Sequence, residues 1–191
     1  GTGMIDFKGE KRTNQTHEST TDPEAKLMRR GNGQPAKLCF GGHALMENRS
    51  GLCTDLAITD SRTAEPVVAE ALLKRLRRKG IRPATVGGDK GYHTKASVKA
   101  LRRMKIRPHI ARIENRRTDG LDARTTRHES YRVSQRKRKR IEEIFGWLKT
   151  VGGLRKSRFV GIKRTQLYAY LAASAYNLLR IAKLTAQPVP G

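Results

Sequence analysis

The sequence predicts an α/β fold in which helices flank a mixed β-sheet. Strand and helix patterns alternate along most of the chain, which is typical of layered α/β domains. One pair of strand patterns is joined by a short turn, whereas the later strands are separated by helices and are expected to run parallel. The 191 residues suffice for one domain, but a hydrophobic content of 36% predicts a small core. We expect an irregular arm over residues 1–35, the domain over 36–184 and a tail over 185–191.

A β-hairpin is expected to open the domain. Residues 36–46 carry Leu38, Phe40 and Leu45 as apolar positions, and residues 52–59 alternate between apolar and polar side chains. The polar segment between them ends in glycine, which is a turn signal. This hairpin supplies the antiparallel part of the sheet.

The later elements follow from spacing and from glycine breaks. Apolar residues at helical intervals, closed by Gly80, predict a helix over 65–79. Beyond it we expect a strand at 82–87, a helix at 94–105, a strand at 106–113, a long basic loop at 115–132, a helix at 134–151 and a final helix at 163–184. One apolar face of the final helix carries Leu167, Tyr170, Leu171, Ser174, Leu178 and Ile181. We expect the tyrosines of this helix in the core or at an interface.

The composition predicts a nucleic-acid partner. Lys and Arg total 41 against 17 acidic residues, which gives a formal net charge of +24. Such a charge destabilises a compact chain through self-repulsion, and a polyanion relieves it. Charge alone favours nucleic-acid binding, with a packaging protein or a solvated basic surface as the alternatives. Cys39 and Cys53 suit buried free thiols, and neither a signal peptide nor an apolar membrane span is visible, so we expect a reducing, cytoplasmic setting without a membrane partner.

Two carboxylates are candidates for chemistry. Asp89 follows a predicted strand and is flanked by glycines, a common ligand position in α/β folds, although a turn aspartate is an equally good interpretation. Glu142 lies on a predicted helix at the edge of its apolar stripe. Arg138 precedes it by one turn and Lys149 follows it by two, so the three share one flank. Spacing alone favours an ordinary ion pair between Arg138 and Glu142 over a functional role.

These residues resemble a group of bacterial insertion-sequence transposases of the DDE type, whose signature is Tyr-x2-Arg-x3-Glu-x6-Lys. Arg138, Glu142 and Lys149 match that signature, and residues 88–92 resemble the segment that carries the group's second aspartate. Similar runs occur at residues 19–25, 36–39, 43–49, 125–128, 150–156 and 175–178. The resemblance covers most of residues 8–184.

The resemblance implies an RNase H-like fold and the cleavage and transfer of DNA strands. It implies two divalent ions, Mg²⁺ or Mn²⁺, with Asp89 and Glu142 as the second and third acidic ligands. Arg138 and Lys149 would then hold DNA phosphates or order Glu142. The implied partners are transposon ends and target DNA in a bacterial cytoplasm. A homodimer is compatible with the sequence, which does not specify the oligomeric state.

Two departures from the family pattern matter. Gln135 stands where the signature has tyrosine, and the family's first aspartate would precede residues 8–12, so we expect the chain to lack it and its strand. Neither Asp6 nor Asp22 ends an apolar strand pattern. We therefore expect DNA binding with little or no cleavage by the chain alone. The open sheet position would be covered by residues 5–7 or by a partner chain.

The predicted basic loop offers phosphate contacts through Arg112, Arg116, Arg117 and Arg127, although a solvated charge run is the alternative.

Two other functions compete with that of a transposase. One is a non-catalytic basic protein that binds nucleic acid, such as a decayed remnant. The other is an RNase H-like nuclease of DNA repair, which the length of the resemblance disfavours.

Overall fold

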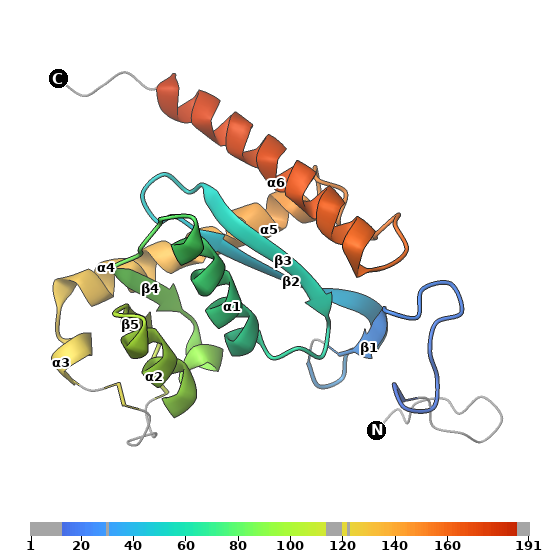
Figure 1. Ribbon diagram of the computed structural model, residues 1–191, viewed down its shortest axis with the longest axis horizontal. Coiled ribbons are helices and arrows are strands. Elements are labelled where there is room, and N and C mark those ends of the chain that lie inside the picture. The colour runs from blue at the N-terminus through green and yellow to red at the C-terminus, as the bar shows by residue number, and fades with distance from the viewer. Residues whose placement is uncertain (1–12, 30, 114–119, 122, 187–191) are drawn as a thin grey trace.

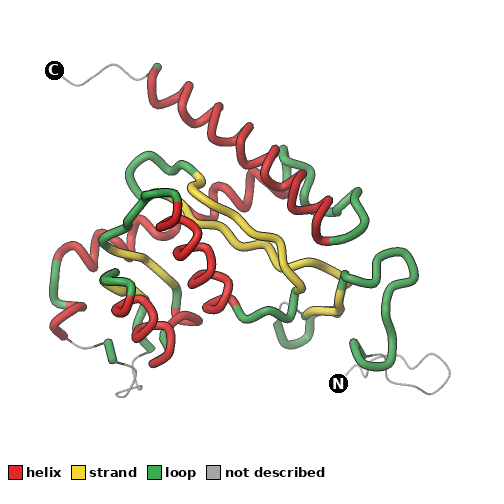
Figure 2. The backbone as a smooth tube through the Cα atoms, in the orientation of Figure 1, coloured by secondary structure: helices red, strands yellow, loops and turns green. Residues whose placement is uncertain are grey.

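The computed structural model describes residues 13–29, 31–113, 120–121 and 123–186 (Figure 1). Strands and helices alternate through the central part, and helices make up most of the C-terminal third (Figure 2). In chain order the elements are β1 (Lys26–Met28), β2 (Lys37–Met46), β3 (Cys53–Asp60), α1 (Glu65–Arg78), β4 (Thr85–Gly88), the 3-10 helix η1 (Lys90–Tyr92), α2 (Lys95–Arg103), β5 (Arg107–Ile110), α3 (Ala123–Thr126), α4 (Glu129–Lys137), the 3-10 helix η2 (Arg138–Arg140), α5 (Ile141–Lys149) and α6 (Ile162–Thr185).

The strands form two sheets, where the sequence predicted one mixed sheet. An antiparallel sheet has the order β1-β2-β3, and a parallel sheet contains β4 and β5. The predicted hairpin is confirmed, with Ala44 of β2 opposite Leu56 of β3. Its turn contains Gly51 at φ +76°, a conformation that favours glycine. The antiparallel and parallel parts of the prediction are thus both present, but the described residues do not join them by hydrogen bonds.

The N-terminal segment is more regular than the predicted arm. Strand β1 pairs with the beginning of β2, and Lys26 lies opposite Cys39. The side-chain amide of Asn14 accepts a hydrogen bond from the Leu27 backbone N–H (2.7 Å) and donates one to the Leu27 carbonyl (2.9 Å). A short polar segment therefore becomes a strand because tertiary contacts satisfy its backbone on both sides.

The predicted loop at 115–132 and the predicted helix at 134–151 need correction. Helix α3 and the first turn of α4 lie inside the loop range, and η2 interrupts the later helix. The helix begins early because Tyr131 anchors it: its hydroxyl donates to the Ile110 carbonyl (2.8 Å), and its ring packs edge-on against His109. Local composition does not reveal these contacts, which join residues about twenty positions apart.

Two apolar clusters hold the layers together. One joins α5 and α6 to the β2–β3 hairpin, with Ile144 and Leu56 at its centre. Trp147 packs against this cluster and meets the ring of Tyr176 edge-on at 5.7 Å. The other cluster lies among α1, α2 and β5, with Leu73 and Ile110 at its centre. Each sheet thus has its own small core.

Helix α6 packs on the hairpin through a face different from the one that the leucines mark. Its buried residues are small or bear hydroxyls: Thr165, Ala169, Ala172, Ala173 and Tyr176. The leucine-rich face identified in the sequence is exposed. Of the three tyrosines of α6, only Tyr176 is buried, and it lies on the inner face. Small residues occupy the inner face of α6 because they let the helix approach β3 closely.

Within the described part of the chain, no helix has the length and apolar character needed to cross a membrane.

Candidate active-site cleft

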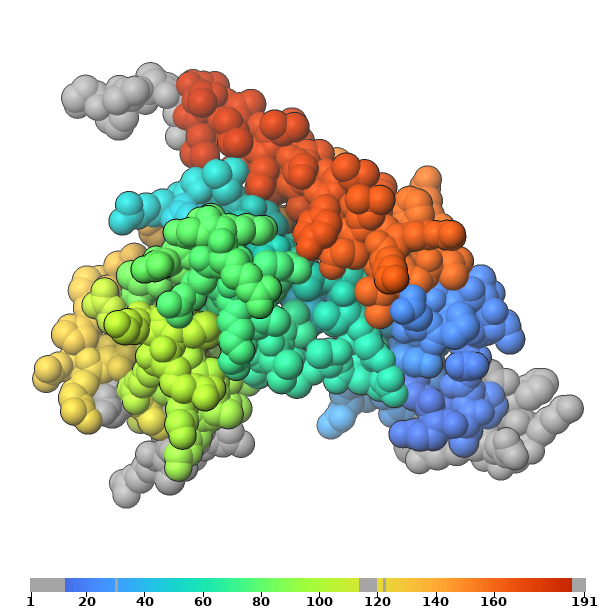
Figure 3. Space-filling model, viewed as in Figure 1, coloured from blue at the N-terminus to red at the C-terminus, as the bar shows by residue number. Residues whose placement is uncertain are grey.

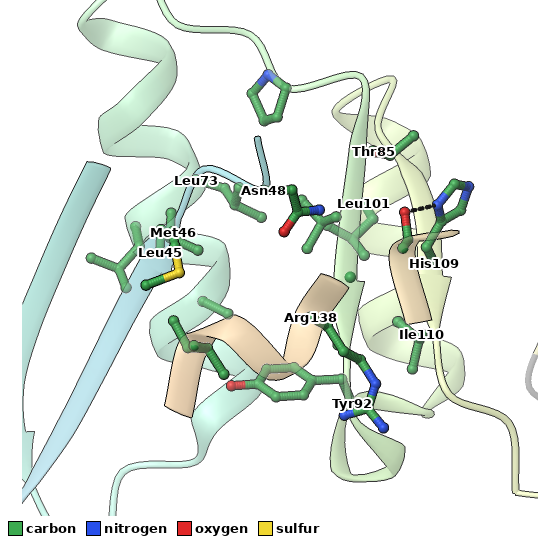
Figure 4. A pocket seen from close by; sticks show the side chains of 18 of the residues that line it. Leu45, Met46, Asn48, Leu73, Thr85, Tyr92, Leu101, His109, Ile110 and Arg138 are labelled. Atoms are coloured by element: carbon green, nitrogen blue, oxygen red, sulfur yellow. Dashed lines mark hydrogen bonds between the residues drawn. The ribbon is translucent and has the colours of Figure 1, made fainter. Parts of the chain in front are cut away.

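A cleft of about 1030 Å³ separates the two sheets. The β2 residues Leu45 and Met46 lie on one side of it, and the β5 residues His109 and Ile110 lie on the other (Figure 4). Helix α1 contributes apolar side chains, including Leu73, while η2 and α5 contribute charged ones. Elements that are distant in the sequence therefore line one space.

Two strand edges face this cleft without a neighbouring strand in the described structure. Strand β2 uses one edge to pair with β3 from Phe40 to Met46, and β1 occupies the opposite edge only at residues 37–39. Strand β4 pairs with β5 on one side alone. The cleft-lining parts of β2 and β4 thus expose backbone groups that an additional strand could bond.

Asp89 lies at the C-terminal end of β4 and lines the cleft. It is the N-cap of η1, and its Oδ1 accepts a hydrogen bond from the Gly91 backbone N–H at 2.8 Å. A Cβ at position 91 would lie 3.1 Å from that oxygen, so glycine lets the turn close tightly. Asp89 is exposed, and its turn role leaves the carboxylate accessible from the cleft. The structural and functional interpretations of Asp89 are therefore compatible.

Glu142 lies in the first turn of α5, exposed, and lines the same cleft as Asp89. The ordinary ion pair expected between Arg138 and Glu142 is absent from this described region. Arg138 belongs to η2, and the tighter 3-10 turn disturbs the i, i+4 alignment of a continuous α-helix. Fold topology brings Asp89 and Glu142 to one space although they are distant in sequence.

Gln135 holds Arg138 in place at the cleft. The Arg138 Nε donates to the Gln135 Oε1 at 2.9 Å, and the Gln135 Nε2 donates to the His109 backbone carbonyl at 2.5 Å. The amide thus links the guanidinium to β5. The sequence showed Gln135 only as a departure from a signature, whereas the structure gives it two hydrogen-bonding partners.

Three polar groups of the cleft were missed in the sequence. The buried His109 contacts Ser134 through Nδ1 and Oγ at 2.7 Å, and this contact fastens α4 to β5 (Figure 4). Burial lowers the pKa of His109, with smaller contributions from Arg107 and His128. Burial also raises the pKa of the Tyr92 phenol, and the Glu65 carboxylate raises it further. The proximity of Tyr92 to Asp89 in the sequence was the one available signal.

The remaining predicted phosphate contacts lie outside the residues that line the cleft. The Lys149 Nζ lies 5.9 Å from the centre of the Phe145 ring. Arg112 and Arg127 are exposed, the first just after β5 and the second just after α3. Arg116 and Arg117 fall outside the described residues. Of the predicted basic residues that the structure describes, Arg138 is therefore the one that lines the cleft together with the two carboxylates.

The donor chemistry of the cleft fits a divalent cation in part. Asp89 and Glu142 offer carboxylate oxygens, which hard ions such as Mg²⁺ prefer. Among the described residues, no group of three or more His, Cys, Asp or Glu side chains gathers closely enough to hold a metal ion.

The chain is strongly basic, and acidic residues line its cleft, a combination that is typical of proteins acting on nucleic acid. Residues 12–178 match the family model of the transposase DDE domain, and the chain belongs to this family. The family acts in DNA transposition as polynucleotidyl transferases, generally with divalent metal ions and with DNA as substrate. No curated protein and no solved structure matches the chain significantly.

Proposed function

We propose that this chain contributes Asp89 and Glu142 to the metal-dependent cleavage and transfer of DNA strands by an insertion-sequence transposase. The observation that supports the proposal is that both acids line one cleft although they come from β4 and α5. Membership of the transposase DDE family supplies the reaction class. The match of Arg138, Glu142 and Lys149 to the Tyr-x2-Arg-x3-Glu-x6-Lys signature supports the particular group.

The residues of the cleft divide the work. Divalent ions, when bound, stabilise the attacking and leaving oxygens of an in-line displacement at phosphorus. Asp89 and Glu142 would hold them, and the Gly91 N–H keeps one Asp89 oxygen oriented. Arg138 would bind a phosphate oxygen through the guanidinium nitrogens that Gln135 does not engage. Because Gln135 also hydrogen-bonds to β5, it would hold the Arg138 guanidinium at the cleft.

We further propose that a strand between β2 and β4 completes both the sheet and the site. One inserted strand would join the two sheets into the mixed sheet of an RNase H-like fold. Such a strand needs edges about 9–10 Å apart, twice the usual spacing of neighbouring strands. Where a partner chain supplies this strand, a third acidic ligand on it would reach the cleft beside Asp89; this role is not assigned to Asp6. Residues 5–7, which fall outside the described part of the chain, and a partner chain are the two proposed sources.

Metal binding tests the carboxylate pair. Mn²⁺ is titrated into the purified chain while its melting temperature is measured, because a ligand that binds the native state stabilises it. We expect a rise that Asp89→Asn and Glu142→Gln each abolish. Glu143→Gln is the matched control, since Glu143 is exposed beside Glu142 but does not line the cleft. A response that survives in both cleft variants would overturn the assignment.

A nicking assay tests the incomplete site. The chain alone is expected to cleave plasmid DNA poorly in Mg²⁺ or Mn²⁺. Strong nicking that Asp89→Ala abolishes would show that the described residues already hold a sufficient site. The absence of both metal response and nicking, together with tight DNA binding, would favour the alternative of a non-catalytic nucleic-acid-binding remnant.

Salt dependence tests the DNA contacts. The logarithm of the association constant falls with the logarithm of salt concentration, by about 0.9 per neutralised phosphate. Alanine at Arg112 and Arg127 together is expected to reduce the slope by about 1.8 if both contact phosphate. Arg78→Ala and Lys163→Ala, two exposed cations elsewhere, serve as the matched control pair. An equal reduction in both pairs would assign binding to net charge alone.

A further inference from the structure

Helix α1 begins beside the turn that carries Asp89. Glu65, its first residue, lines the cleft together with Tyr92 of η1 and His43 of β2. Burial raises the pKa of the Tyr92 phenol, and the charges of Glu65 and Asp89 raise it further, so both carboxylates lie close to it. Burial lowers the pKa of His43, and the nearby Glu65 charge opposes this shift. Polar side chains of β2, α1 and the η1 turn therefore meet at one place in the cleft.

Tyr92 is fixed to the Asp89 turn through its backbone and its side chain. Its N–H donates to the Asp89 carbonyl at 3.3 Å, and its carbonyl accepts from the Thr94 N–H at 2.8 Å. Its side chain packs against Gly88, where an added Cβ would lie 3.4 Å from three Tyr92 carbon atoms. The ring also packs against the apolar cluster of α1, α2 and β5. The position of this side chain and the conformation of the Asp89 turn are therefore coupled.

The phenol of Tyr92 connects this turn with α1. The ring lies across one end of the cleft (Figure 4). Hydrogen bonding to Glu65 adds to the effects of burial and charge on the pKa of the phenol. A half-buried phenol needs a polar partner, and a carboxylate is a strong acceptor for its hydroxyl. Glu65 is thus the acceptor that the first turn of α1 supplies.

Helix α1 is a well-fixed support because it packs against both halves of the fold. It contacts β2 and β3 on one side and η1 and α2 on the other. Figures 1 and 3 show α1 between the hairpin and α2. Its apolar face is buried through Val68, Leu72, Leu73 and Leu76. A hydrogen bond between Glu65 and Tyr92 therefore ties the Asp89 turn to the element that holds the two sheets together.

Glu65 also has an ordinary structural interpretation. An acidic side chain in the first turn of a helix interacts favourably with the positive end of the helix dipole. Helix α1 has Ala64 at its N-cap position and no side-chain hydrogen bond there, so a carboxylate in this turn is useful. That interaction requires the charge of Glu65, whereas a bond from Tyr92 requires only an accepting oxygen. A substitution that removes the charge and keeps the oxygen separates the two interpretations.

We propose that Glu65 and Tyr92 position Asp89: the Glu65 carboxylate accepts from the Tyr92 hydroxyl and so fixes the turn that presents Asp89 to the cleft. The importance of Asp89 rests on the proposed function, but the Glu65–Tyr92 contact itself requires no metal ion. Both are positioning residues, because they act through Asp89. Hydrogen bonds behind a ligand hold it in the orientation in which a cation meets it.

Backbone order in the metal-free chain tests the Glu65–Tyr92 contact. Order parameters of the Lys90 and Gly91 amides, measured by nitrogen relaxation in NMR, should be near the rigid value of about 0.85. Tyr92→Phe and Glu65→Ala should each lower them toward about 0.6. The Arg107 amide, which donates to the Ala84 carbonyl at the other end of the parallel sheet, should keep its order.

The conservative variant Glu65→Gln distinguishes the contact from a helix-dipole effect. Its amide oxygen still accepts from Tyr92, so the order of the η1 amides should be retained. A role in the helix dipole alone would make Glu65→Gln and Glu65→Ala equivalent. The double variant Tyr92→Phe with Glu65→Ala should be no more mobile than the more severe single variant, because the two partners share one interaction. Additive effects would overturn the proposal.

Two substitutions elsewhere serve as matched controls. Glu70→Ala removes another carboxylate of α1, which pairs with Lys74 at 2.9 Å. Tyr131→Phe removes another phenol, which donates to the Ile110 carbonyl. Neither should change the order of the η1 amides. Tyr92→Phe keeps the packed ring, so unchanged circular dichroism of this variant shows that the fold is intact.

Manganese affinity connects the contact with the site. Tyr92→Phe and Glu65→Ala should each raise the Mn²⁺ concentration that gives half of the thermal stabilisation by at least about tenfold, the usual effect of losing a partner behind a ligand. Reduced order with unchanged Mn²⁺ affinity would overturn the positioning role, as would unchanged order in Tyr92→Phe. A wild-type chain without any Mn²⁺ response would instead overturn the proposed function, and the order parameters would then decide on the contact alone.

Discussion

Both polar atoms of the Asn177 side chain hydrogen-bond to the backbone of Cys53. The Asn177 Oδ1 accepts from the Cys53 N–H at 2.8 Å, and the Asn177 Nδ2 donates to the Cys53 carbonyl at 2.8 Å. Gln166 serves the same strand farther along, with its Oε1 accepting from the Ile58 N–H at 2.7 Å. Two side chains of α6 thus close the outer edge of β3, while β2 presents its unpaired edge to the cleft.

Asn177→Ala is expected to lower the free energy of unfolding by about 1–3 kcal/mol, because it leaves backbone groups beneath α6 without partners. Urea denaturation measures the change. Lys163→Ala, on the exposed face of the same helix, should alter stability by less than about 0.5 kcal/mol. Equal losses in the two variants would show that the amide contributes nothing specific.

Arg75→Met is expected to destabilise the fold by about 3 kcal/mol, because it removes the nearer of two cations beside a buried charge and leaves only Lys79, whose Nζ lies 3.9 Å from the Asp55 Oδ2. The Asp55 side chain is 1% exposed, and Arg75 contacts its two oxygens at 2.6 and 2.7 Å. Arg78→Met, at an exposed position of the same helix, should have little effect.

A double variant separates the charge from the packing. Adding Asp55→Asn to Arg75→Met removes the uncompensated charge but keeps an oxygen that can accept from the Leu56 N–H. Equilibrium unfolding should show that the double variant is more stable than Arg75→Met alone. A double variant that is less stable would mean that hydrogen bonding, rather than charge, dominates at this position.

Cys53 is expected to resist alkylation in the native protein. Burial raises the pKa of its thiol to about 11, and the nearby Asp55 charge acts in the same direction. At pH 8 only about one thiol in a thousand is then ionised. Mass spectrometry after treatment with iodoacetamide should show label on the half-buried Cys39 first. Cys53 should react only after unfolding; fast native labelling of Cys53 would contradict its buried environment.

Stability is expected to fall as the pH drops below about 6.5. Burial holds the pKa of His109, and likewise that of His43, below the ordinary value of 6.5. The unfolded chain therefore binds protons first, so the contribution is present above pH 6.5 and is lost toward the lower native pKa. The pKa values of Glu47, Asp60 and Glu70 are lowered as well, but their effect begins below about pH 4.5.

Urea unfolding at about pH 7.5 and 5.5 measures this dependence. His109→Gln should reduce the difference between the two conditions, whatever its effect on absolute stability. His17→Gln, at an exposed histidine, should leave the difference unchanged. A difference that His109→Gln does not reduce would assign the acid sensitivity to other groups, His43 foremost.

The elements with strong local patterns could be predicted from the sequence. The hairpin and helices α1, α2 and α6 lie where periodicity and glycine breaks placed them, within a few residues. Strand β1 and the early start of α4 could not be predicted, because Asn14 and Tyr131 create them through contacts with distant backbone. Asp89 and Glu142 were identified as candidates by motif, but the spacing also suggested an Arg138–Glu142 ion pair, whereas the Arg138 Nε donates to Gln135 in the structure.

The amino-acid sequence by itself determined the α/β class, the basic character and the transposase DDE resemblance, because composition, periodicity and motif spacing are local properties of the chain. Only the tertiary structure decided that the strands form two sheets with a cleft between them, that Asp89 and Glu142 share that cleft, and that α6 turns its leucines outward. These three features depend on which faces of the helices and sheets pack against one another. In α6 the alanines allow close packing on β3 and the amides of Gln166 and Asn177 bond its edge, so hydrophobicity alone does not choose the buried side.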